Sequence, residues 1–152
     1  MPFDGITTFA TCRELSEALV GGRIDKIYQP EADEAVLNVR SHGKMYRLLL
    51  TANASHARLH LTQQKPETPL QPPMFCMLFR KHFTGGKISQ IIQHNFDRII
   101  EIRFEVLNEL GDPCEKSIFM EIMGKHSNLI LVDERGQIID SVRHVNPLMS
   151  SV

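Results

Sequence analysis

One ten-residue motif occurs twice in this chain, and its recurrence constrains the fold more than any other feature. It reads GGRIDKIYQP over residues 21–30 and GGKISQIIQH over residues 85–94. Five of the ten positions are identical, and Arg23 is matched by Lys87, which carries the same charge. Because chance rarely produces such agreement over so short a stretch, we expect the chain to contain two copies of one structural unit.

The segments before the two copies share the signals of a helix. TTFATCRELSEALVGG offers Thr7 and Thr8 as caps and apolar residues at helical spacing. QPPMFCMLFRKHFTGG has prolines that suit a helix start and a strongly apolar turn after them. We therefore predict one helix before each copy, ended by Gly21 in the first half and by Gly85 in the second.

Strand-forming segments follow each copy in the same order. The β-rich stretches cover residues 34–40 and 44–52 in the first half, and residues 97–106 and 115–123 in the second. Each half then reaches an H-x-x-L-x-L pattern, in SHARLHLT and in KHSNLILV. One unit is therefore a helix and about four strands, and the two units occupy about residues 5–62 and 72–133.

A unit of this size cannot bury its sheet face alone, so the two copies must cover each other. We predict an α+β fold: a two-layer antiparallel β-sandwich, or flattened barrel, of about eight strands flanked by two helices. Residues 136–145 are a candidate for a further strand. The residues expected to be buried in the two copies are Ile24, Ile27, Ile88 and Ile91.

Length and composition indicate one globular domain over residues 1–152, and the ending NPLMSSV suggests a fragment of a longer protein. The formal net charge of −1 lacks the basic excess of many nucleic-acid binders, so an anionic partner must meet a local patch. Neither a membrane span nor a signal peptide is evident. The cysteines, Cys12, Cys76 and Cys114, fit reduced thiols, and we expect a cytoplasmic protein with no membrane contact.

The histidine pair His56 and His60 has metal-ligand spacing for a helix, but ARLHLT reads as a strand without an acidic partner, so we predict neither metal nor cofactor. NFDRII differs, because Asp97 and Arg98 lie where a loop enters a long strand. The pair is either a solvated surface turn or an acceptor and a fork of donors that can bind a phosphate or an unpaired base.

Other cations near this motif in the sequence are candidate accessory contacts for an anion. Arg80, Lys81, His82 and Lys87 form a local basic cluster. His126, in EIMGKHSN, follows a strand in a turn that suits either an anion contact or a purely structural role.

Several ordered blocks, FDGI, GGRIDKIYQP, PPMFCMLFRKH, NFDRII and EIMGKHSNLILVD, together resemble the amino-terminal domain of the NFACT proteins, and of their bacterial members above all. The resemblance implies a tRNA- and ribosome-binding module of a ribosome quality control factor. Such factors bind stalled large ribosomal subunits with peptidyl-tRNA and recruit tRNA, for alanine in bacteria, to extend the nascent chain without mRNA. The family's Asp-Arg pair, which its tRNA-dependent role requires, falls on Asp97 and Arg98, with the remaining domains of the full-length protein as further partners.

The resemblance also implies a fold related to the amino-terminal domain of formamidopyrimidine DNA glycosylases, which use an amino-terminal proline as nucleophile beside a glutamate. This chain has Pro2, but Phe3 follows it and Asp4 is the nearest acid, so we expect no enzyme activity. Two alternatives stay open: a fibronectin-binding adhesin, which the family's older name records, and base-excision chemistry.

Overall fold

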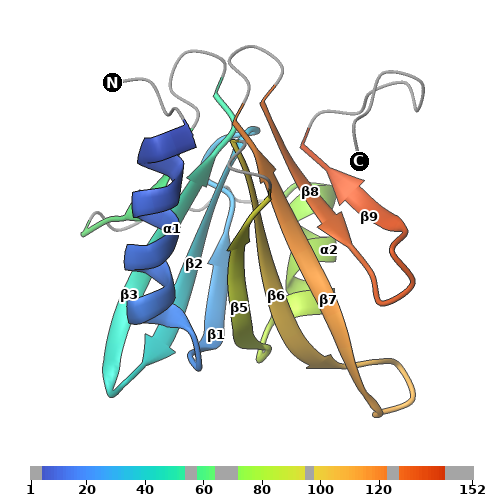
Figure 1. The fold of residues 1–152 in the computed structure, drawn as a ribbon. Coiled ribbons are helices and arrows are strands. Elements are labelled where there is room, and N and C mark those ends of the chain that lie inside the picture. The colour runs from blue at the N-terminus through green and yellow to red at the C-terminus, as the bar shows by residue number, and fades with distance from the viewer. Residues whose placement is uncertain (1–4, 54–57, 64–71, 95–97, 123–126, 143–152) are drawn as a thin grey trace.

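The computed structural model describes residues 5–53, 58–63, 72–94, 98–122 and 127–142. Within these ranges the chain forms two helices and nine strands (Figure 1). The first half contains α1 (Gly5–Leu19), β1 (Arg23–Tyr28), β2 (Glu34–Ser41), β3 (Lys44–Thr51) and β4 (Arg58–Leu61). The second half contains α2 (Met74–Phe83), β5 (Lys87–Gln93), β6 (Ile99–Leu107), β7 (Pro113–Glu121), β8 (Asn128–Val132) and β9 (Ile138–Ser141).

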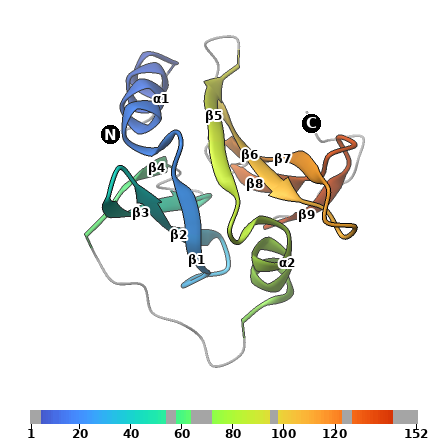
Figure 2. The same ribbon diagram turned by 90° about the horizontal axis from the view of Figure 1, so that it is seen from below.

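All strand pairs in the described residues are antiparallel, and they form one sheet in the order β4-β3-β2-β1-β5-β6-β7-β8-β9. Neighbours in each half follow each other along the chain, because short connections join antiparallel strands. Within the described strands of the sheet, the two halves pair through β1 and β5, which share the residue pair Arg23 with Lys87. Seen from below, β1 and β5 lie at the centre with the other strands of their halves to either side (Figure 2).

The junction between the halves is built twice from the same hydrogen bonds. Gly21 N donates to Ile88 O over 2.8 Å, and Gly85 N donates to Ile24 O over 2.9 Å. Gly21 and Gly85 have φ values of 92° and 81°, a backbone region that glycine enters at little cost and that ends each helix as predicted.

The second glycine of each copy is needed for a different reason, namely close packing. A Cβ on Gly22 would lie 2.8 Å from Val39 Cγ1, and a Cβ on Gly86 would lie 2.7 Å from Val106 Cγ1. Each Gly-Gly pair therefore combines a turn with a close approach of the chain to the neighbouring strand.

The helices pack across the junction: α1 contacts β5 as well as β2 and β4, and α2 contacts β1 as well as β6 and β9. Each helix thus covers a strand of the other half. On α2, Phe75, Phe79 and Phe83 form successive edge-to-face contacts that continue to Phe104 on β6. These contacts place one hydrophobic core between the halves.

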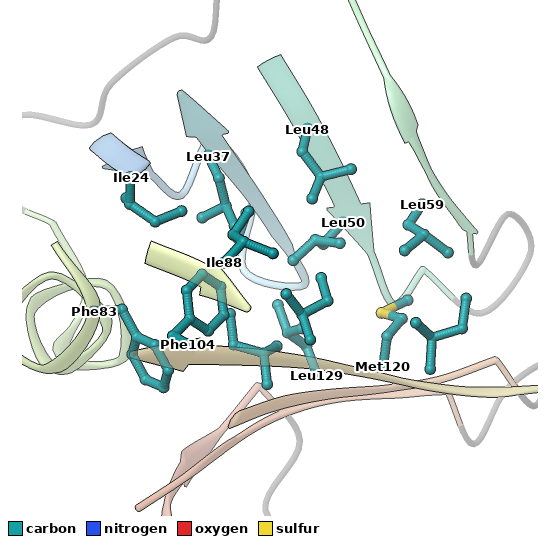
Figure 3. Close-up of a cluster of buried hydrophobic side chains, with 14 of the residues drawn as sticks. Ile24, Leu37, Leu48, Leu50, Leu59, Phe83, Ile88, Phe104, Met120 and Leu129 are labelled. Carbon is teal, nitrogen blue, oxygen red and sulfur yellow. The ribbon is translucent and has the colours of Figure 1, made fainter. Parts of the chain in front are cut away.

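The core side chains of the two halves face each other, as Figure 3 shows for Leu37, Leu48 and Leu50 on one side and Phe104, Met120 and Leu129 on the other. This arrangement confirms the predicted α+β class and its sheet-based sandwich. Eight strands belong to the helix-plus-four-strand order of the two halves, and β9 is the candidate strand within residues 136–145.

The predicted burial of the repeated isoleucines is also confirmed. Ile24, Ile27 and Ile88 are at most 2% exposed, and Ile91 is 8% exposed. The predicted threonine caps of the first helix are wrong, because α1 begins at Gly5, before Thr7 and Thr8.

Candidate nucleic-acid interface

The candidate site lies where the β5–β6 hairpin ends. His94 N donates to Ile99 O over 3.0 Å and closes the ladder just before the connection to β6. Arg98 precedes β6 and is exposed, while its carbonyl accepts a hydrogen bond of 2.8 Å from Ile122 N. The backbone of Arg98 is therefore held by β7's end, and its side chain is presented at the surface.

Two strand connections lie at this end of the sheet. Register aligns Ile99 with Glu121 and Glu121 with Asn128, so β5 and β7 end where β6 and β8 begin (Figure 1). Asp97 and His126 belong to these connections and lie outside the described residues.

A buried carboxylate organises the outer face of β6, the strand that begins directly after Arg98. Glu101 is 5% exposed, and its Oε1 accepts a hydrogen bond of 2.8 Å from His94 Nε2. Its Oε2 accepts from Arg103 Nε over 2.9 Å and from Ser117 Oγ over 2.6 Å. Arg103 Nη1 also donates to Gln90 Oε1 over 3.1 Å. These side chains come from three adjacent strands and from the residue that follows β5, so the network fixes the geometry of the hairpin end.

The pKa of Glu101 is set by two opposing effects. Burial raises the pKa, but hydrogen bonds from Arg103, Ser117 and His94, with the positive charge of Arg103, outweigh burial and hold it below its ordinary value. The hydrogen bond to Glu101 and the negative charge of that carboxylate raise the pKa of Arg103. Glu101 is thus an ionised carboxylate at neutral pH, and its charge is compensated locally.

Two rings are stacked on the same face. The His94 ring lies nearly parallel to the Phe119 ring, with centroids 5.8 Å apart and an interplanar angle of 19°. Both side chains are partly exposed. The exposed Arg98 guanidinium has the chemistry to contact a phosphate, and the partly exposed rings at this end of the sheet have the chemistry to contact an unstacked base.

Three accessory contacts predicted from the sequence, Arg80, Lys81 and Lys87, do not gather at Arg98. Arg80 is partly buried, and its Nε donates to Ile27 O over 2.8 Å, so this guanidinium holds α2 against β1. Lys87 begins β5, and Arg98 follows its other end; the seven residues of β5 separate them by roughly 20 Å. Lys81 is exposed, and its Nζ lies 3.9 Å from Glu109 Oε1. Lys81 and Lys87 line one groove together, away from Arg98.

The network around Glu101 was not predicted from the sequence, although the alternation of polar and apolar residues in β6 indicates part of it. Glu101 and Arg103 alternate with the apolar residues of β6 and so occupy its face away from the core. Which residue of β5 or β7 lies opposite them depends on register, which the sequence pattern did not determine.

The histidine pair with metal-ligand spacing lies only partly within the described residues. There, no group of three or more histidine, cysteine or acidic side chains could hold a metal ion. His60 lies on β4 with Nδ1 2.9 Å from Leu61 O, while His56 and Pro2 lie outside the described residues. No helix in the described ranges is both long and apolar enough to cross a membrane.

Fold and site together define an antiparallel β-sandwich domain in which each helix contacts strands of both halves, with a candidate interface at a hairpin end. The chain belongs to the NFACT family: residues 4–152 match the family described as NFACT N-terminal and middle domains.

Curated relatives support this assignment. The chain is 45% identical over 152 residues to the Rqc2 homolog RqcH of Bacillus subtilis, covering 99% of this chain and 27% of that protein. It is 43% identical over 146 residues to the Rqc2 homolog RqcH of Streptococcus pneumoniae, covering 95% and 26%. The chain therefore spans about a quarter of the length of these Rqc2 homologues.

Solved structures share the fold. The N-terminal domain of fibronectin-binding protein PavA from Streptococcus pneumoniae superposes with a TM-score of 0.92 at 42% identity, covering 97% of this chain and 56% of that one. The fibrinogen binding protein from Staphylococcus aureus superposes with a TM-score of 0.87 at 41% identity, covering 97% and 53%.

Proposed function

We propose that this chain is the tRNA-binding module of a ribosome quality control factor and that Arg98, with Asp97, contacts tRNA. The observation that carries the proposal is the exposed Arg98 at the end of a hairpin whose backbone is fixed by Ile122. A guanidinium offers five N–H donors in a planar fork, which suits a phosphate or a base edge. Membership in a family with Rqc2 homologues supports RNA as the partner.

The outer sheet face at this end of β5, β6 and β7 supports the same reading. His94 and Phe119 offer ring faces to an unpaired base, and Arg103 adds positive charge to this surface. Glu101 would repel RNA if it stood alone, but it is buried and receives hydrogen bonds from Arg103, His94 and Ser117. The network therefore lets an acidic strand position coexist with an anionic partner.

The wider role proposed for the full-length protein follows its relatives. With its remaining domains, it binds stalled large ribosomal subunits with peptidyl-tRNA in the cytoplasm and recruits tRNA, for alanine in bacteria, for C-terminal tailing without mRNA. The accessory role proposed for His126 belongs to this interface. In this proposal the domain binds RNA and performs no covalent chemistry of its own.

The test is recovery of tRNA with the purified full-length protein. Arg98→Ala keeps the carbonyl that accepts from Ile122 and removes charge-assisted hydrogen bonds worth about 1.5–3 kcal/mol each, so tRNA recovery should fall by about tenfold or more. The melting temperature should change little, because the side chain is exposed. Asp97→Ala should behave alike.

Arg135→Ala, in the exposed turn between β8 and β9, is the control. Full tRNA recovery with Arg98→Ala would refute the assignment.

A second candidate function is fibronectin binding, because structural neighbours at 42% identity are described as fibronectin-binding proteins. The same variants separate the two functions. If fibronectin capture by the full-length protein persists in Arg98→Ala while tRNA recovery is lost, the two activities use different surfaces.

A further inference from the structure

A row of like charges crosses the sheet where its two halves meet. Register places Arg23 of β1 directly opposite Arg40 of β2 on one side and opposite Lys87 of β5 on the other. Like charges in direct cross-strand register destabilise a sheet. Within the described part of the chain, the side chains of Arg40 and Lys87 make neither a hydrogen bond nor an ion pair. Two members of the row have a favourable contact, because Lys87 lies opposite Glu105 of β6 and Arg23 donates to a backbone carbonyl. Arg40 lies opposite Met45 on its other side, so nothing in the described part of the fold offsets its like-charge pairing with Arg23.

The row opens onto a groove of about 500 Å³ at the β1–β5 junction. Arg23, Lys81 and Lys87 supply its permanent positive charges, and Glu105 supplies its negative charge. Arg23 Nη1 donates to Gly85 O over 3.2 Å, which fixes the guanidinium at the groove while its other N–H groups stay available. Lys81 contacts Glu109 only at 3.9 Å between two exposed side chains, a pair that a ligand can displace at little cost.

The floor of the groove permits a ligand to approach closely. Gly85 is exposed, and a Cβ built there would meet no atom within 4 Å. Thr84 adds a hydroxyl to the lining. The groove thus leaves room for a ligand at Gly85. Around it are a guanidinium, two ammonium groups and a hydroxyl, which can all donate hydrogen bonds to phosphate oxygens.

We propose that this groove, with Arg40 beside it, is a second RNA contact that binds the phosphodiester backbone irrespective of base sequence. The inference rests on the proposed RNA-binding function and adds a site at the other end of β5 from Arg98. Adjacent strands are about 4.8 Å apart, so Arg40, Arg23 and Lys87 form an extended row of cations. Such a row matches a polymer with one negative charge per repeat better than a single compact anion. Two contacts separated along β5 would fix the direction in which RNA lies on the domain.

The experiment measures binding of full-length protein to tRNA and to a single-stranded uridine oligonucleotide over a series of salt concentrations. Removing one phosphate contact reduces the slope of log K against log salt by about 0.7–0.9. Arg23→Gln and Lys87→Gln should each reduce that slope by this amount with both RNAs, and weaken binding several-fold at low salt. Arg135→Gln removes the same charge at an exposed turn outside the groove and should leave the slope unchanged.

The outcomes separate this inference from the proposed function. Wild-type slopes in Arg23→Gln and Lys87→Gln, together with loss of tRNA in Arg98→Ala, would overturn the groove and leave the proposed function intact. Reduced slopes on the uridine oligonucleotide with no effect of Arg98→Ala on tRNA would support the groove and contradict the proposed role of Arg98. A polyglutamate peptide is the competing ligand class. If it binds as tightly as the uridine oligonucleotide or more tightly, and Lys87→Gln weakens that binding, the groove is a site for an acidic protein segment and the RNA proposal is overturned.

Discussion

At the scale of single residues, Glu101 shows how a buried charge supports a surface site. Its carboxylate accepts three side-chain hydrogen bonds, so Glu101→Gln would turn one acceptor into a donor that faces other donors. We expect this variant to lose about 2–3 kcal/mol of unfolding free energy, measured by urea unfolding. Glu105→Gln, at an exposed position of the same strand, should change stability by less than about 0.5 kcal/mol.

The pH dependence of the stability difference between wild type and Glu101→Gln follows from the lowered pKa of Glu101. A carboxyl group whose pKa is lower in the folded than in the unfolded state adds stability that is present above its unfolded pKa. That contribution is lost as the pH falls through the folded pKa, below the ordinary value of 4.5. The difference in stability between wild type and Glu101→Gln should therefore be largest near neutral pH and shrink under acid. A constant difference from pH 7 to pH 3 would contradict this role of the carboxylate.

At the scale of elements, Arg80 shows why a cation in a basic cluster need not bind an anion. Its Nε donates to Ile27 O and joins α2 to β1 across the junction between the halves. Arg80→Ala should lower the unfolding free energy by about 1–2 kcal/mol, measured by urea unfolding, without changing tRNA recovery by the folded protein. Lys81→Ala, its exposed neighbour on α2, should leave stability nearly unchanged. If Arg80→Ala instead lost tRNA with unchanged stability, Arg80 would be an accessory RNA contact, as the sequence predicted.

The element order could be predicted because its signals are local. Gly21 and Gly85 end the helices, and alternating apolar residues mark the strands, so the two halves and the candidate ninth strand follow from the sequence. The contact of each helix with a strand of the other half could not be predicted, because an apolar helix face fits a neighbouring strand without specifying which one. Sequence distance is also a poor guide to which cations lie near Arg98. Lys87 is close to Arg98 in the sequence, but the length of β5 separates the two residues in space.

At the scale of the whole molecule, the helices that contact both halves make each half incomplete. The buried cluster joins Leu15 and Leu19 of α1, the phenylalanines of α2 and strands of both halves. A separated half would expose one face of its sheet and leave its helix without the strand that it contacts in the other half. Folding of the two halves should therefore be one cooperative event.

Fragments 1–66 and 67–152, divided between β4 and α2, test this coupling. Each fragment alone should show no cooperative thermal unfolding by circular dichroism, because burying one sheet face requires the other half. Mixed in equal amounts, they should regain the strand signal and a cooperative transition, since the β1–β5 hydrogen bonds and both helix contacts need no covalent link. The control is the intact chain cut by a protease at a site inserted between the halves, which should keep its transition after cleavage. A fragment that unfolds cooperatively by itself would mean that one half has a sufficient core, and that the helix contacts with the other half add stability to a unit already folded.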